Sequence, residues 1–403
     1  MALALAAAQV EAQRREPDHA DAPTLGWLYL TEHFAPQAGE LLADAQRRWP
    51  GVQWVGASGV GIAANGVEYF DEPALSLLLA ELPRAQFRVF SGARPLGDFA
   101  AHTANVHADP TTADLGELLH DLSARTGAGY LFGGLASGRA RSLHIADAAL
   151  AGGLSGVAFG AGIGLLSRVS QGCQPVGPQR VITAAERNVV LALDGEPALE
   201  CLLRDAGLAG VEPREALPRL RQILVGLGGD TDGVDDDAAP RRAFDNGVSR
   251  RGAFGAETRV RHLVGLDPAR RGVAIAELVQ PGMALAFCAR HVEAARRDLM
   301  RICAELREEV EPETLPLAAA LARRDAPGGD APSAAASGIA GAIYVSCAGR
   351  GGAHFGAPSA ELALVRHALG DVPLAGFFAA GEIARANLYG YTGVLTVFTS
   401  ASA

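Results

Sequence analysis

Lysine is absent from the 403 residues, so all 35 basic side chains are arginines. Without a lysine amine, the chain cannot carry out Schiff-base chemistry of the lysine type. Acidic residues number 45 and give a formal net charge of −10 at pH 7. An acidic chain without a basic stripe is repelled by phosphate backbones. We therefore expect no nucleic-acid partner.

Cysteine is scarce, and no two of the five thiols have the spacing of a zinc knuckle or a redox C-x-x-C pair. Free thiols are typical of a reducing cytosol, which favours a cytoplasmic protein. The acidic stretch Asp230–Gly233 lacks the order of an EF-hand loop and is interpreted as a solvated loop. No cofactor motif is found, and we expect neither a metal nor another cofactor.

A long charge-free helix is also missing. Residues 148–166 carry no charge, but six of them are glycines, which weaken helices and suit strands and turns. This run is therefore predicted to be buried strand and turn rather than a membrane span, and no membrane partner is expected. Residues 1–22 begin with an apolar stretch that has no preceding positive charge, so we interpret them as a tail rather than a signal peptide.

What the sequence does contain is a recurring strand–helix–strand pattern, at residues 25–55, at 342–375 and, in part, at 114–132. Each copy leads into two glycines five residues apart, which are Gly56 and Gly61, Gly133 and Gly138, and Gly376 and Gly381. Such units build layered structure, and glycine at a strand exit permits a turn or a close approach of the backbone. The pattern predicts an α+β fold of two related domains, with mixed β-sheets layered by helices. Gly56, Gly133 and Gly376 should lie at strand ends.

Two sequence blocks near the C-terminus indicate a particular family more specifically than this pattern does. They are Ile343–Gly351, which ends in Ser-Cys-Ala-Gly-Arg-Gly, and Pro373–Ile383. Both resemble the C-terminal domain of the FIST family, although Ala380 stands where that family often has asparagine. Ser170–Pro178 and Leu193–Ala198 are similar to the end of the family's N-terminal domain.

The resemblance implies tandem domains, and the sharp turn Asp194–Pro197 places their boundary, which gives domains at residues 23–196 and 197–403. It also implies an intracellular sensory protein that binds a small-molecule ligand, amino acids having been proposed for the family. Because no attached signalling domain is recognised, this chain would signal through a separate protein or act as a stand-alone binder. A non-catalytic interaction scaffold is the alternative among binding proteins.

The candidate ligand site follows from the positions of charged residues after two strands. Cys347, Arg350 and Gly351 follow one strand, and Glu382 follows the next. Parallel neighbours would bring them to one sheet edge, in one pocket and outside the core. Arg350 suits a carboxylate and Glu382 an ammonium group, which together fit a zwitterion. The alternatives are a solvated loop arginine and a structural glutamate.

Asn387 and Ser58 complete the candidate ligand-binding set. Asn387 lies in a polar, aromatic stretch, and Ser58 is the hydroxyl of the first glycine turn, where each could equally bond to its own turn. A second role is open for Cys347, because a neighbouring arginine favours a thiolate. His354 would be its base in a thiol-dependent hydrolase or acyl transferase. Since no nucleophile signature accompanies them, we predict a protein that is not an enzyme.

Overall fold

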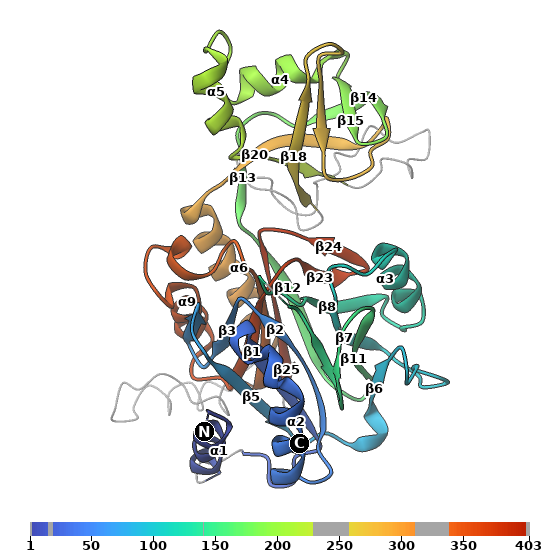
Figure 1. Ribbon diagram of the computed structural model, residues 1–403, viewed down its shortest axis with the longest axis vertical. Coiled ribbons are helices and arrows are strands. Elements are labelled where there is room, and N and C mark those ends of the chain that lie inside the picture. The colour runs from blue at the N-terminus through green and yellow to red at the C-terminus, as the bar shows by residue number, and fades with distance from the viewer. Residues whose placement is uncertain (1, 15–18, 140, 229–257, 311–337, 400–403) are drawn as a thin grey trace, which may run out of the picture. The chain divides into compact units, whose positions relative to one another are not determined.

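The computed structural model describes residues 2–14, 19–139, 141–228, 258–310 and 338–399 (Figure 1). The chain divides into two compact units. Unit 1 comprises Met1–Ser170 and Arg296–Ala403, and unit 2 comprises Gln171–Ala295. The acidic stretch Asp230–Gly233 lies outside the described residues. The limits 23–196 and 197–403 remain a prediction about the sequence blocks, and the compact units divide the chain at other places.

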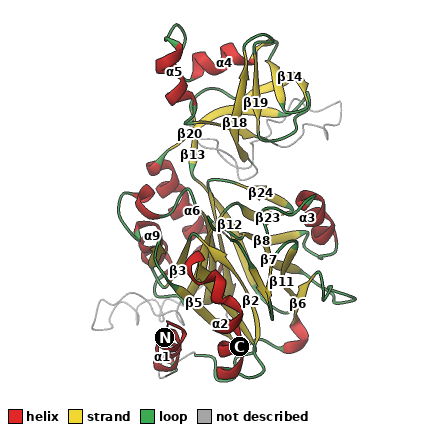
Figure 2. Cartoon of the chain, viewed as in Figure 1, coloured by secondary structure: helices red, strands yellow, loops and turns green. Residues whose placement is uncertain are grey.

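Helices and mixed sheets confirm the predicted α+β class (Figure 2). Unit 1 contains three sheets. The first has the order β10-β9-β2-β1-β5, with β10 Ala149–Leu150, β9 His144–Ala146, β2 Gln53–Gly59, β1 Leu25–Thr31 and β5 Leu75–Ala80. The second has the order β24-β23-β8-β7-β11-β6, with β24 Asn387–Tyr389, β23 Glu382–Arg385, β8 Tyr130–Leu135, β7 Thr103–Ala108, β11 Leu154–Phe159 and β6 Phe87–Ser91. The third has the order β12-β25-β21-β22-β3-β4, with β12 Leu165–Gln171, β25 Thr392–Thr399, β21 Ile339–Cys347, β22 Leu374–Ala379, β3 Gly61–Ala64 and β4 Val67–Phe70.

Each sheet of unit 1 contains one parallel pair, β1–β2, β7–β8 or β21–β22. One α-helix connects the strands of each pair. The connecting helices are α2 (Ala38–Arg48), α3 (Leu115–Ala124) and α9 (Ala360–Leu369). Their buried residues recur at helical spacing, as Leu115, Leu119 and Leu122 do in α3. Each helix therefore turns an apolar stripe inward while it reverses the chain direction between parallel strands.

The three glycines lie inside β2, β8 and β22, so the expectation that they mark strand ends is wrong. A Cβ on Gly56 would lie 1.9 Å from the Leu28 carbonyl oxygen of the parallel neighbour. At Gly133 and Gly376 the corresponding distances, to the carbonyl oxygens of the parallel neighbours, are 1.9 Å and 1.8 Å. Glycine is required here because two backbones approach one another, and the sheet continues beyond it.

The charge-free run at 148–166 forms β10, β11 and the start of β12, as predicted, and Ser155–Phe159 is buried. Among the described residues, no helix is both long enough and apolar enough to cross a membrane. The N-terminal segment expected as a tail forms α1 (Ala2–Gln13), with Leu3 and Ala7 buried.

Unit 2 is a closed antiparallel barrel. The strand β20 (Ala284–Arg290) pairs with both β14 (Arg180–Glu186) and β17 (Ile223–Leu227), which closes the path β20-β14-β15-β19-β18-β17. The other elements are β13 Cys173–Pro175, β15 Val189–Leu193, β16 Glu196–Pro197, β18 Arg259–Asp267, β19 Gly272–Ile275, α4 Ala198–Asp205 and α5 Pro213–Leu220. Helix α6 (Val292–Val310) follows β20. Three short 3-10 helices, η1 Glu32–Gln37, η2 Arg84–Gln86 and η3 Gly352–Phe355, complete the elements of the described chain.

Candidate functional site

The parallel pairing of β21 with β22 confirms the expected neighbourhood, since Cys347 lies opposite Ala379 at the ends of these strands. The turn after β21 carries Arg350 and Gly351, and Glu382 opens β23. The expectation that Arg350 and Glu382 stay outside the core is wrong, because both side chains are fully buried.

Arg350 has internal partners on two sides of its guanidinium group. Its Nε donates to Glu361 Oε1 at 3.0 Å, and Nη2 lies 2.8 Å from the same oxygen. Its Nη1 donates to the carbonyl oxygen and the hydroxyl of Ser170, at 3.0 and 2.8 Å. Burial lowers the pKa of Arg350, but Glu361, Tyr344 and Glu382 together outweigh this effect, and the pKa is raised. Arg350 was expected to bind the carboxylate of a ligand, but Glu361 of α9 supplies a carboxylate from within the protein.

Glu361 is the centre of a buried polar cluster. The hydroxyl of Tyr344 donates to its Oε1 at 2.6 Å, and Ser346 Oγ donates to the same carboxylate at 3.1 Å. Glu68 of β4 accepts from the backbone N–H groups of Glu361 and Leu362, at 3.1 and 3.2 Å. The first turn of α9 therefore donates its free N–H groups to a carboxylate on a strand that is distant in sequence.

Glu382 is bonded through one oxygen only. Oε2 accepts from the backbone N–H and the hydroxyl of Thr392, at 3.1 and 2.6 Å. Oε1 makes no hydrogen bond of normal geometry with any residue in the described ranges. Burial raises the pKa of Glu382 to about 8, although the Thr392 bonds and Arg350 act in the opposite direction.

Cys347 carries a thiol that resists ionisation. Burial, followed by the negative charge of Glu382, raises its pKa to about 12. Hydrogen bonds from the backbone N–H groups of Gly349 and Tyr391 only partly offset these two effects. A thiol in this state is a weak nucleophile at neutral pH.

The remaining candidates, Gly351, Ser58 and Asn387, lie in different surroundings. A Cβ on Gly351 would lie 1.8 Å from Cζ of Phe70, so this glycine accommodates an aromatic ring of β4. Ser58 is buried in β2, where its Oγ accepts from the Leu143 backbone N–H at 3.0 Å. Asn387 is half-buried in β24.

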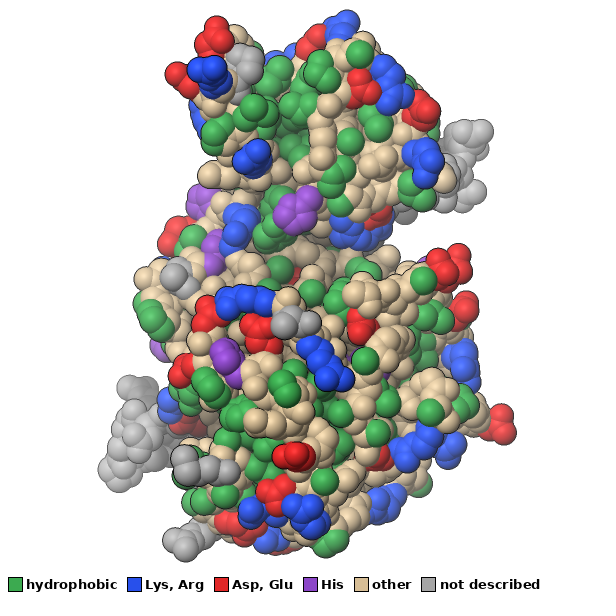
Figure 3. Space-filling model, in the orientation of Figure 1, with side chains coloured by type: hydrophobic (Ala, Val, Ile, Leu, Met, Phe, Trp, Pro, Cys, Tyr) green, Lys and Arg blue, Asp and Glu red, His purple; other side chains and the backbone are tan. Residues whose placement is uncertain are grey.

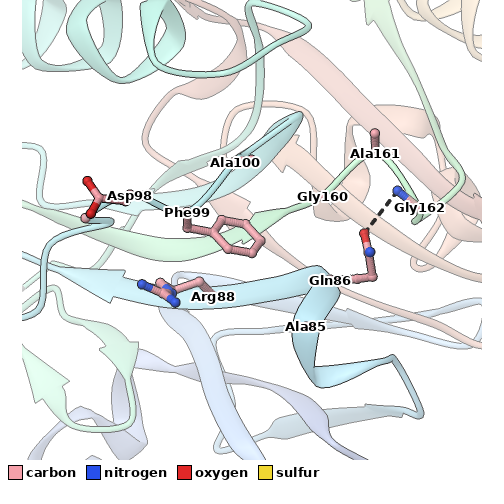
Figure 4. A pocket seen from close by; sticks show the side chains of 10 residues that line it. Ala85, Gln86, Arg88, Asp98, Phe99, Ala100, Gly160, Ala161 and Gly162 are labelled. Carbon is pink, nitrogen blue, oxygen red and sulfur yellow. Dashed lines mark hydrogen bonds between the residues drawn. The ribbon is translucent and has the colours of Figure 1, made fainter.

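A cavity of about 770 Å³ lies elsewhere in unit 1, and none of the six candidate residues lines it. Its walls come from η2 and β6, from the loop after β6, and from the turn after β11 (Figure 4). Gln86 Oε1 accepts from the Gly162 backbone N–H at 3.1 Å and holds that turn against η2. A Cβ on Gly160 would lie 2.5 Å from Gln86 Oε1, so a side chain there would displace the Gln86 amide from its present place.

The cavity presents both signs of charge next to an aromatic ring. The side chains of Arg88 and Asp98 are exposed, and neither forms an ion pair within the part of the chain that the structure describes. Arg88 Cζ lies 5.4 Å from the centroid of the Phe99 ring. Sequence reasoning missed this place because the glycines of the turn belong to the charge-free run. Arg88 and Asp98 lie more than sixty residues earlier, so no local pattern joins the two segments.

Two family models match the chain. The FIST N domain matches residues 24–196, and the FIST C domain matches residues 216–385. The chain belongs to the FIST family. Among similar proteins, the uncharacterized protein Rv0628c of Mycobacterium tuberculosis (strain ATCC 25618 / H37Rv) is 30% identical over 412 residues, covering 98% of this chain and 96% of its own length. The uncharacterized protein Mb0898c of Mycobacterium bovis is 29% identical over 415 residues, covering 98% of this chain and 95% of its own.

Both FIST regions contribute strands to unit 1. In the third sheet, β22 from the FIST C region pairs with β3 from the FIST N region, with Gly376 opposite Ala63. In the second sheet, β23 pairs with β8, with Glu382 opposite Gly134. The buried cluster around Glu361 is thus shared by the two FIST regions, whereas the cavity at Arg88 belongs to the FIST N region alone.

Proposed function

We propose that this FIST protein is a cytoplasmic sensory protein that binds a small zwitterion, such as an amino acid, in the cavity beside β6. The observation that carries the proposal is the pair of exposed charges, Arg88 and Asp98, that line a cavity of about 770 Å³ together with Phe99. FIST domains are associated with sensing of small ligands, which supports the same function.

The chemistry of the lining fits the three parts of an amino acid. A guanidinium fork binds a carboxylate through two parallel hydrogen bonds, so Arg88 would hold the acid group. The Asp98 carboxylate would receive the ammonium group, and the Phe99 ring would cover an apolar side chain. Cavities of about 300–1,000 Å³ are usual for small-molecule sites.

Signalling would pass through a separate protein. The cavity joins the β6 end of the second sheet to the turn after β11, and β11 pairs with both β6 and β7. A ligand that bridges these segments would stabilise one arrangement of this sheet edge, which a partner could recognise. Acidic and basic side chains are interspersed on the face shown in Figure 3, which supports a protein partner over nucleic acid.

Thermal unfolding against a panel of amino acids and nucleotides tests this proposal. A ligand that binds only the folded state raises the unfolding midpoint by mass action. For an amino acid found in this way, Arg88→Ala should weaken binding about tenfold or more, since one charge-assisted hydrogen bond contributes about 1.5–3 kcal/mol. Asp98→Asn should act similarly on amine-bearing ligands. Arg47→Ala on α2, which exchanges a similarly exposed arginine, is the matched control.

The buried cluster offers the second location for the ligand. The unbonded Oε1 of Glu382 is the observation that favours it, because a buried acceptor without a partner is costly. Binding that survives Arg88→Ala and Asp98→Asn but is lost in Glu382→Gln would move the site there. Activity of the protein on thioester or ester substrates, abolished by Cys347→Ala, would instead support the hydrolase alternative.

A further inference from the structure

Two buried cysteines of unit 2 lie on adjacent antiparallel strands. Cys173 is on β13 and Cys288 on β20, where Cys173 faces Arg290 and Cys288 faces Pro175. Residues two positions apart along a strand share a face, so the two thiols are diagonal neighbours on one side of the sheet. They are close enough to hydrogen-bond to one another, and this contact contributes to a raised pKa of Cys288.

The two strands differ in how firmly they are held. Cys288 lies in the middle of β20, which also pairs with β17 and places Leu224 opposite it. In contrast, β13 has only three residues and stands at the end of the sheet path. Short edge strands open locally at a lower free-energy cost than central strands, so local opening of β13 would bring Cys173 to solvent while the barrel stays folded.

The positions of the two cysteines along the chain mean that a disulfide between them would strongly affect the stability of unit 2. Unit 2 begins at Gln171 and ends at Ala295, so Cys173 and Cys288 stand near its two ends. A cross-link between them would enclose the whole barrel in one covalent loop. The loss of unfolded-state entropy on cross-linking grows with loop length. A disulfide between these two cysteines should therefore stabilise unit 2 more than a disulfide between cysteines close together in the sequence.

We propose that Cys173 and Cys288 are a redox-modification site, at which a peroxide converts the two thiols into a reversible disulfide that closes unit 2. The Cys173 thiolate attacks one peroxide oxygen, giving a sulfenic acid and releasing water or an alcohol. The Cys288 thiol then loses its proton and attacks the Cys173 sulfur, and the expelled hydroxide takes up that proton and leaves as water. The two thiols lose two electrons, the peroxide gains them, and a dithiol reverses the reaction.

The other three cysteines supply internal controls. Cys201 is on α4, Cys303 on α6 and Cys347 on β21, so they lie on separate elements. Burial raises the pKa of both Cys303 and Cys347 to about 12. The Cys173 contact and burial also raise the pKa of Cys288, so the expected selectivity rests on proximity. Cys173 and Cys288 lie on paired strands, whereas the other three cysteines lie on separate elements and should form no disulfide.

The test treats the full-length protein with hydrogen peroxide, alkylates the remaining thiols after unfolding and maps the peptides by mass. The expected result is a Cys173–Cys288 cross-linked peptide, with an unfolding midpoint raised by roughly 10 °C and restored by dithiothreitol. Cys173→Ala and Cys288→Ala should each abolish both effects, whereas Cys201→Ala should retain them. Three results with the wild-type protein would overturn the proposal. They are alkylation of all five thiols after peroxide treatment, oxidation to sulfinic acid without a cross-link, and a cross-link between any other pair of cysteines. The wild-type measurement decides the question even where a variant fails to fold.

Discussion

At the scale of single residues, burial decides what the charged side chains of the FIST C motif do. Arg350 and Glu382 follow strands that the sequence identified, and yet both are enclosed. Arg350 meets Glu361 and Ser170, partners 11 and 180 positions away along the chain. A motif gives the residue type and its place after a strand. It does not reveal which distant side chain completes the ion pair, because that depends on how α9 and β12 pack.

Glu382 should make the stability of the protein depend on pH. Burial raises its pKa to about 8 in the folded state, from 4.5 when it is free. Between pH 4.5 and 8, the folded state therefore keeps a proton on Glu382 that the unfolded state has lost. The free energy of unfolding falls as pH rises through this window, by up to about 1.4 kcal/mol per pH unit. Denaturant unfolding of wild type and Glu382→Gln from pH 5 to 8 measures this contribution.

Because glutamine stays neutral, the stability difference between the two proteins should change across that window. Burial also raises the pKa of Glu68, to about 7, and this residue is present in both proteins, so its effect cancels in the comparison. A constant difference from pH 5 to 8 would mean that Glu382 is already ionised in the folded protein at pH 5.

At the scale of secondary structure, periodicity predicted the elements well and their internal irregularities poorly. The strand–helix–strand pattern expected at 25–55 forms β1, α2 and β2, and the pattern expected at 342–375 forms β21, α9 and the start of β22. Alternating and helical apolar patterns are local properties of a sequence, so they can be found without knowing the partners. The role of Gly376 could not be found in this way, since it depends on where the Tyr344 carbonyl of the neighbouring strand lies.

Gly376→Ala should destabilise the protein by about 3 kcal/mol or more, because the new methyl group would meet a backbone oxygen that cannot rotate away. Gly116→Ala is the matched control. Gly116 lies in α3 with no atom near its missing Cβ, and alanine there should raise stability by roughly 0.5–1 kcal/mol. Urea unfolding of both variants gives the comparison. Equal stability of Gly376→Ala and wild type would show that β21 and β22 can separate at this point without cost.

At the scale of the whole molecule, the order of sequence blocks differs from the order of folding units. The FIST N and FIST C matches are consecutive along the chain, whereas unit 1 takes strands from both, and unit 2 combines the end of the FIST N match with the first part of the FIST C match. Sequence reasoning placed a boundary at residue 196 because a sharp turn lies there. The long-range pairings β22–β3 and β23–β8 carry no local pattern, so the sequence could not predict them.

This arrangement predicts how fragments of the chain behave. Residues 171–295 contain the closed barrel and its apolar core, so this fragment should fold alone, with cooperative thermal unfolding followed by circular dichroism. Residues 24–196 contain β3 and β8 but lack β22 and β23, which leaves backbone N–H and C=O groups of the inner strands unpaired. That fragment should aggregate or show no cooperative transition, and adding residues 296–403 in trans should restore folding. Cooperative unfolding of residues 24–196 alone would show that the FIST N region forms a complete core without the C-terminal strands.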